Sequence, residues 1–248
     1  MSKRIALYTP EMAKKLMVIL SLVGLLVVPS GSSGSSAYGA YGANKVTVFA
    51  ASSLTEPFTQ IGKNFEKAHP GVKIQFSFQA SSTLLTQINA GAPADVFVSA
   101  EPFKGGSDYL INHVVLAVPK SSSLNKIKDL NNKVTWIQCA PEVPCGAAAN
   151  AALAGEGVTR KPSSLEPKVS SAVAKLLAGE VDAAIIYKTD VIVNSKKLRA
   201  IEFANQAAAA TTYQTKLLRK STWGATFMSY LRSKSVLKIL QSKGFEIK

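Results

Sequence analysis

The sequence is poor in the residue types from which metal sites and catalytic centres are usually built. It contains two histidines and two cysteines in 248 residues. Neither His69 nor His113 has an obvious serine and carboxylate partner of the kind a hydrolase needs. The chain also lacks a Gly-x-Ser-x-Gly elbow, a Walker-type phosphate loop and a dinucleotide fingerprint. These absences argue against an enzyme, and we expect no cofactor and no metal-ion ligands.

Acidic residues are scarce as well, with 15 Asp and Glu against 29 Lys and Arg and a formal net charge of +14. A nucleic-acid-binding protein could carry such a charge. The basic residues, however, are scattered through the second half at helical spacing, and no zinc finger, basic zipper or RNA-binding signature is present. We therefore expect no nucleic-acid partner. A basic surface that steers a small anion toward its site accounts for the charge better.

The N-terminal apolar run is too short to cross a membrane comfortably. Residues 16–28 would span roughly 20 Å as a helix, against a hydrocarbon core of about 30 Å. A basic opening precedes this run, and Pro29 and a Gly/Ser stretch follow it. Residues 1–30 are therefore predicted to be a secretory signal peptide, with a retained N-terminal anchor as the alternative, and residues 31–44 a flexible tether. No cysteine follows the run to accept a lipid, and we expect an exported protein in the periplasm or on the outer face of the cytoplasmic membrane.

If the protein is exported, Cys139 and Cys145 can form a disulfide bond. In an oxidising compartment they could close a small loop and stabilise the fold by roughly 2 kcal/mol. A metal pair would need further ligands, and neither histidine is near in the sequence. The spacing is also not that of a Cys-x-x-Cys redox motif. We predict a disulfide, and two free buried thiols are the remaining alternative.

From Lys45 onward, strand-like and helix-like segments alternate. Apolar or alternating runs predict strands at 46–50, 72–78, 95–98, 114–118, 134–137, 181–187 and 198–203. Three-and-four spacing of apolar residues predicts helices at 54–69, 84–91, 147–154 and 170–178 and helical segments within 222–243. This alternation indicates an α/β protein with parallel sheets covered by helices.

Four short turns, each leading into a predicted helix, carry most of the functional information: residues 50–54, 80–84, 143–146 and 167–170. A helix N-terminus presents unpaired N–H groups and the positive end of a dipole, so it can bind an anion. Four converging N-termini would hold an oxyanion with neutral donors alone. The alternative for Ser53 and Ser81 is that each merely caps a helix.

These segments resemble the periplasmic molybdate-binding proteins of ABC transporters. The resemblance is carried, in order, by Val46–Leu54, Ser81–Leu84 with Gln87 and Ile88, Gly91–Ala100, Pro141–Gly146, Gly179–Tyr187 and Gly244–Ile247. It covers most of residues 45–248. It implies the two-lobed periplasmic-binding-protein fold (type II), in which each lobe is a mainly parallel sheet flanked by helices and the ligand lies in the interlobe cleft. Lobe one would comprise 45–111 with about 205–248, and lobe two about 112–204.

The resemblance also implies the ligand contacts. They fall on Ser53, Ser81, Cys145, Val169 and Tyr187. The two serines would each offer a hydroxyl and a backbone N–H, Cys145 and Val169 a backbone N–H, and Tyr187 its phenolic O–H. Tyr187 taken alone could equally be a core tyrosine, and Val169 rests on the resemblance alone. Such a donor-only set rejects protonated oxyanions such as hydrogen phosphate, whose O–H would meet no acceptor.

The expected function is capture of molybdate, and of tungstate, which is close to it in size, for an ABC importer. Sulfate would have to be rejected on size, so a broader, sulfate-type oxyanion carrier is the alternative, as is a surface binding protein with the same fold but no transport role. The expected partner is a membrane permease, and the protein is expected to be a monomer. One departure from the family is a chain about a dozen residues shorter between Ala100 and Asn112, where the usual helix is missing.

Overall fold

The computed structural model describes residues 44–248. The predicted signal peptide or anchor and nearly all of the predicted tether lie outside the described residues. Within residues 44–248, no helix combines the length and the apolar character that a membrane crossing requires.

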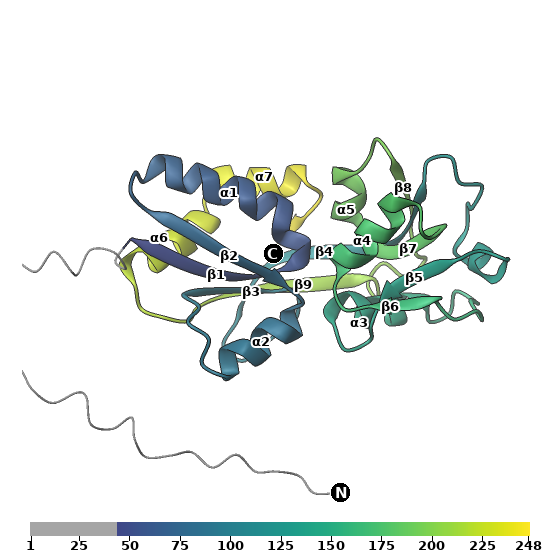
Figure 1. The fold of residues 1–248 in the computed structure, drawn as a ribbon, viewed down its shortest axis with the longest axis horizontal. Helices are drawn as coiled ribbons and strands as arrows, with labels where there is room; N and C mark the ends of the chain where they lie inside the picture. The colour runs from purple at the N-terminus through teal and green to yellow at the C-terminus, as the bar shows by residue number, and fades with distance from the viewer. Residues whose placement is uncertain (1–43) are drawn as a thin grey trace, which may run out of the picture. The chain divides into compact units, whose positions relative to one another are not determined.

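The strands form two groups that share one long strand (Figure 1). The first group is β1 (Lys45–Ala51), β2 (Lys73–Gln79), β3 (Val96–Ser99), β9 (Ala210–Leu217) and β10 (Glu246–Ile247). The second group is β5 (Trp136–Cys139), β6 (Ser164–Glu166), β7 (Ala183–Tyr187) and β8 (Leu198–Ile201). In each group three strands are parallel, β2-β1-β3 and β6-β5-β7. The shared strand, β4 (Ser107–Pro119), runs antiparallel to its neighbours.

Strand β4 crosses from one group to the other. Its first half pairs with β9, ending at His113, and its second half pairs with β7 and β8 from Val114 onward. The predicted strand at 114–118 was therefore too short, because β4 begins at Ser107. The shortened segment before it contains no helix, as predicted, and the chain passes from β3 into the crossing strand through residues 100–106.

Helices cover both groups of strands (Figure 1). Those that pack mainly on the first group are α1 (Thr55–Ala68), which continues the 3₁₀ turn η2 (Ser52–Leu54), together with α2 (Ser81–Asn89), α6 (Thr222–Leu231) and α7 (Lys234–Ser242). Those that contact the second group are α3 (Pro144–Leu153), α4 (Val169–Ala178) and α5 (Lys188–Val193). A further 3₁₀ segment of the described chain is η3 (Ile127–Asn131).

Each group has a hydrophobic core of its own. In the first, Phe58 and Phe65 of α1 and Phe227 of α6 are fully buried with the side chains of β1 and β3. In the second, the apolar half of β4 lies with Trp136 and Ile185 in a core closed by α3, α4 and α5. A third, smaller cluster is formed by Phe49, Leu84, Ala94 and Phe97, where α2 packs against β1 and β3.

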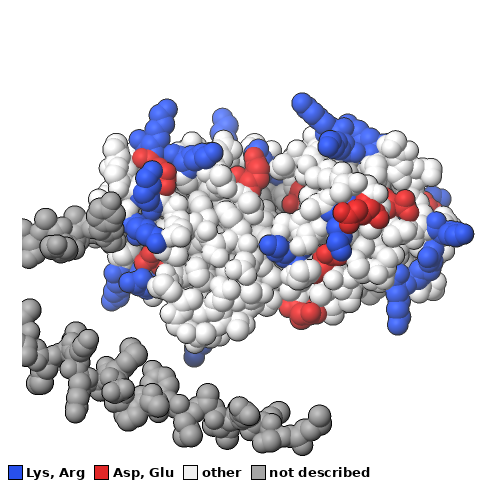
Figure 2. Space-filling view, viewed as in Figure 1, with Lys and Arg blue, Asp and Glu red and all other residues white. Residues whose placement is uncertain are grey.

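Charged side chains are dispersed over the face of the molecule seen in Figure 2. Lys and Arg stand at several separate places on this face, and Asp and Glu lie between them. The positive charge predicted from composition is thus spread over this face rather than collected in one patch.

Candidate anion-binding site

The structure brings all five predicted contact residues around one small cavity. Ser53 and Ser81 reach it from the first group of strands and helices, and Cys145, Val169 and Tyr187 reach it from the second. All five residues are buried, with exposed fractions between 1% and 8%. The volume open to the centre of a water molecule is about 10 Å³, so the cavity has room for about one water. Anything bound there must therefore shed its hydration water.

Four helical segments begin at this cavity. Ser53 lies in η2 ahead of α1, Ser81 is the first residue of α2, Cys145 the second of α3 and Val169 the first of α4. The first N–H groups of a helix have no partner within the helix, and the helix dipole places partial positive charge there. The four segments therefore surround the cavity with amide donors.

The protein does not satisfy these amides with its own side chains. None of the four segments has a side-chain N-cap or an acidic residue in its first turn. Two helices that begin elsewhere are capped: the Ser221 hydroxyl accepts from Gly224 N–H at the start of α6, and the Ser233 hydroxyl accepts from Val236 N–H at the start of α7. Because these helix starts lack side-chain caps and meet at one cavity, their N–H groups can bind an anion that does not belong to the chain.

Neither cavity serine caps its helix, so the alternative stated above is wrong. The Ser53 hydroxyl lies 2.7 Å from the Tyr213 phenol oxygen. The Ser81 hydroxyl accepts a hydrogen bond of 2.8 Å from Ala100 N–H. Each hydroxyl is therefore held by a partner distant in the sequence, which leaves it placed beside the cavity.

Tyr187 closes the cavity from the end of β7. Its side chain is 1% exposed, and its phenol oxygen has no hydrogen-bond partner among the described residues. Burial, and secondarily the neighbouring Tyr213, raise the pKa of Tyr187 well above its ordinary value. The phenol therefore keeps its proton at neutral pH. A buried donor without an acceptor costs roughly 1–3 kcal/mol, and a ligand in the cavity would remove that cost.

A disulfide joins Cys139 to Cys145, as predicted. It ties the end of β5 to the first turn of α3, with 5.7 Å between the two Cα atoms. Since the Cys145 sulfur is in this bond, its contribution to the cavity is the backbone N–H. The bond fixes the turn that presents this N–H, which lowers the entropy cost of binding.

Reduction of this disulfide is expected to lower the free energy of unfolding by about 2 kcal/mol, because a short loop is released in the unfolded chain. Urea unfolding with and without a reductant measures the change. The variant with Cys139→Ser and Cys145→Ser is the control, and the reductant should leave its midpoint unchanged. An identical midpoint for the wild type in both conditions would contradict the expected stabilisation.

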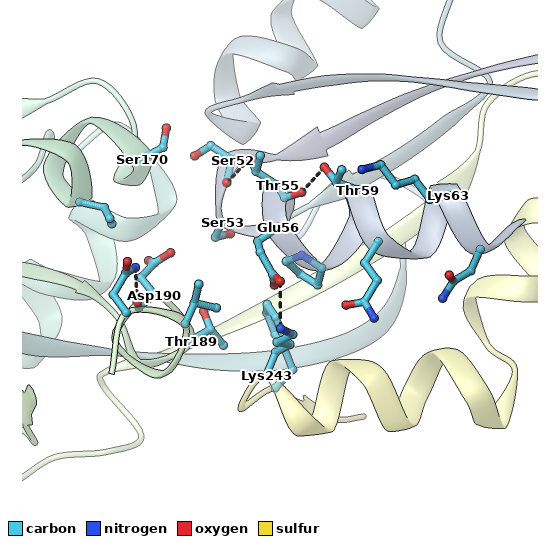
Figure 3. Close-up of a pocket in the computed structure, with 17 residues that line it drawn as sticks. Ser52, Ser53, Thr55, Glu56, Thr59, Lys63, Ser170, Thr189, Asp190 and Lys243 are labelled. Carbon is cyan, nitrogen blue, oxygen red and sulfur yellow. Dashed lines mark hydrogen bonds and ion pairs between the residues drawn. The ribbon is translucent and has the colours of Figure 1, made fainter. Parts of the chain in front are cut away.

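A larger cleft of about 560 Å³ adjoins the cavity and shares Ser52 and Ser53 with it (Figure 3). Residues of α1 line one side and residues of α5 the other, and Lys243 forms an ion pair of 2.9 Å with Glu56 at its wall. Asp190 lies on the α5 side and accepts a hydrogen bond from Tyr187 N–H at 3.2 Å. Burial raises the pKa of this carboxyl to about 7. Asp190 therefore keeps its proton more readily than an exposed aspartate does, which reduces the negative charge beside the cavity.

The fold and the cavity together define the class of the protein. Two α/β halves share crossing strands, and a small cavity lined by residues of both halves is rich in neutral donors. This is the construction of a solute-binding protein.

The chain belongs to the family of bacterial extracellular solute-binding proteins, which it matches over residues 46–246. It is similar to the molybdate-binding protein ModA of Mycobacterium tuberculosis, with 30% identity over 82% of this chain and 85% of that protein. It is also similar to ModA of Escherichia coli, with 30% identity over 82% of this chain and 90% of that protein. The family match confirms the prediction of a binding protein rather than an enzyme.

The same fold is present in a solved structure, the periplasmic molybdate-binding protein of Azotobacter vinelandii. The TM-score is 0.69, with 20% sequence identity over 82% of this chain and 99% of that chain. This likeness confirms the predicted periplasmic-binding-protein fold.

The sequence did not predict the residues behind the cavity wall. Tyr213 on β9 contacts Ser53, and Asn112 on β4 contacts both Tyr213 and Thr189. Asn112 is a fully buried amide at the crossing point of β4. Asn112 lies next to a predicted apolar strand in the sequence. That position could have indicated a buried amide, and a buried amide needs hydrogen-bond partners.

Proposed function

We propose that this protein captures molybdate outside the cytoplasm for an ABC importer, and that tungstate binds in the same way. The observation that carries the proposal is the set of four helix starts without caps around one cavity. The Tyr187 phenol, which has no hydrogen-bond partner within residues 44–248, completes this set. The names of the relatives support molybdate as the anion. The ligand contacts would be Ser53, Ser81, Cys145, Val169 and Tyr187.

The proposed mechanism is closure of two lobes on the anion. Lobe one would comprise residues 45–111 with about 205–248 and lobe two residues about 112–204, a division supported by the two cores. The anion would bridge helix starts from both lobes and so favour the closed state over the open one. The closed, loaded monomer would then dock on the membrane permease. Neutral donors give sufficient stabilisation through helix dipoles and still permit release.

Isothermal titration of the protein from residue 44 onward tests the function. We expect one-to-one binding of molybdate and tungstate and far weaker binding of phosphate, because hydrogen phosphate brings an O–H to a cavity of donors. We expect sulfate to bind much more weakly, because a smaller anion cannot reach all the donors at once. Equal binding of sulfate and molybdate would assign the protein to the broader oxyanion carriers, and no binding of any of the four would refute the proposal.

A further inference from the structure

The Ser53 hydroxyl has a buried partner that the proposed function does not explain. The Tyr213 phenol lies 2.7 Å from it, and Tyr213 is fully buried on β9. Ser53 and Tyr213 are far apart in the sequence, and the sheet places them together behind the cavity. A buried contact this short between two hydroxyls has a donor and an acceptor, and its direction determines what Ser53 can present to a ligand.

Asn112 sets the direction of this hydrogen bond. Its side-chain oxygen accepts from His113 N–H at 3.0 Å, which turns its NH₂ group the other way. That NH₂ group donates to the Thr189 hydroxyl at 2.8 Å and to the Tyr213 oxygen at 3.5 Å. The Tyr213 oxygen thus accepts from Asn112. The ring of Tyr187 lies beside Tyr213, but its phenol oxygen makes no hydrogen bond with any described residue, so the acceptor for the Tyr213 proton is the Ser53 oxygen. Tyr213 therefore donates to Ser53, since the opposite direction would leave a buried phenol proton without a partner.

The Ser81 hydroxyl is constrained in the same way. It accepts from Ala100 N–H at 2.8 Å, a backbone donor whose direction is fixed. Both serine oxygens therefore accept a hydrogen bond from the protein, on the side away from the cavity. The proton of each serine is left for the cavity side, where an oxyanion can accept it.

We propose that Tyr213 is a specificity-determining positioning residue, which holds Ser53 as a hydrogen-bond donor and so excludes oxyanions that carry a proton. This inference rests on the proposed function of oxyanion capture. A fully deprotonated dianion gains from every donor. A protonated oxyanion needs one acceptor in the wall. A serine whose oxygen already accepts from the protein could supply that acceptor only by turning its own proton away from the anion, which would lose a hydrogen bond to the ligand.

The test is Tyr213→Phe, which removes one oxygen and keeps the ring. Titration and competition would give the affinities of the variant and the wild type for molybdate, sulfate and phosphate. Molybdate and sulfate affinity should both fall by about tenfold, the equivalent of one hydrogen bond of ordinary strength. Phosphate affinity should stay the same or rise, so the molybdate-to-phosphate ratio falls while the molybdate-to-sulfate ratio is kept. General loosening of the cavity would not separate the two ratios in this way.

Tyr109→Phe is the matched control. Tyr109 is also buried on a central strand, and its phenol donates one hydrogen bond of 2.6 Å, to the Leu231 carbonyl in the core of the first group. This variant should lose comparable stability and keep both affinity ratios.

Asn112→Leu is the second test variant, since it removes the donor that orients Tyr213 but keeps the phenol. We expect the ratio of molybdate affinity to phosphate affinity to fall in this variant as well. If Tyr213→Phe does not fold, the result for Asn112→Leu tests the proposal.

The outcomes separate this inference from the proposed function. If the wild type binds molybdate and the folded variants keep the wild-type ratio of molybdate to phosphate, the role of Tyr213 is refuted and the proposed function stands. If the wild type itself binds no molybdate, the proposed function fails first.

Discussion

Replacing both Ser53 and Ser81 by alanine is expected to weaken molybdate binding by about 3 to 6 kcal/mol, because each hydroxyl would donate a hydrogen bond to a charged ligand, worth about 1.5–3 kcal/mol. On the affinity scale this is a loss of roughly 10² to 10⁴-fold. The loss should exceed that of either single variant, since the serines stand on different helix starts. Isothermal titration measures the affinity, and thermal unfolding shows whether the fold is kept.

The control for this experiment is a second pair of serines. Ser221 and Ser233 cap α6 and α7, and neither lines the cavity. Replacing both by alanine should cost about 1 kcal/mol of stability per cap and leave molybdate affinity unchanged. If the cavity pair and the cap pair affect affinity equally, the two cavity serines are not ligand contacts.

Gly146→Ala should have the second large effect, on stability as well as on binding. A Cβ atom at this position would overlap the Ala140 carbonyl oxygen, and it would lie 2.5 Å from the Ala140 carbonyl carbon and 2.6 Å from the Cys139 carbonyl oxygen. These are backbone atoms beside the disulfide and cannot turn aside. The start of α3 would have to move, and the Cys145 N–H would move with it. We expect a loss of about 3 kcal/mol or more in unfolding free energy, and a molybdate affinity too weak to detect.

Gly179→Ala provides the comparison for this substitution. Gly179 ends α4 with a φ of 74°, and a Cβ atom there would meet nothing within 4 Å. Backbone strain alone should cost about 1 kcal/mol, with molybdate affinity unchanged. Chemical denaturation and titration of both variants would separate the two effects. Wild-type affinity in folded Gly146→Ala would show that the α3 start does not form part of the binding site.

The predictable parts of the fold are those with a regular apolar pattern. The strand at Val46–Ala50 and the helix beginning near Leu54 were predicted within a residue or two, because their buried positions are occupied by Val, Ile, Leu and Phe. The four helix starts were also predicted, from turns that each contain a serine or a cysteine, although Val169 itself rested on the resemblance. Their convergence on one cavity was an inference from the resemblance, since spacing along the chain carries no information about distance in space.

Two strands and one α-helix were missed for physical reasons. Strand β9 buries Thr211, Tyr213 and Thr215 on one face, so its inward side reads as polar in the sequence. Helix α5 follows β7 without a loop and is only six residues long, and β6 is three residues long. Short elements give too few periods for a pattern to be recognised. The contact between Ser53 and Tyr213 was missed together with β9, because it depends on strand pairing between distant segments.

The order of strands also has a consequence for how the chain reaches its native state. The strands of the second group, β5 to β8, follow one another in the sequence, so that half can assemble as a continuous segment. In the first group, β9 lies between β3 and β4, and β10 pairs with β4. This sheet therefore cannot be completed until residues near the C-terminus are present. Contacts between distant segments form slowly because a long loop must be closed first. During synthesis, residues 45–99 would therefore lack their final strand partners until the end of the chain is made, and a truncated protein would lose the first half rather than the second.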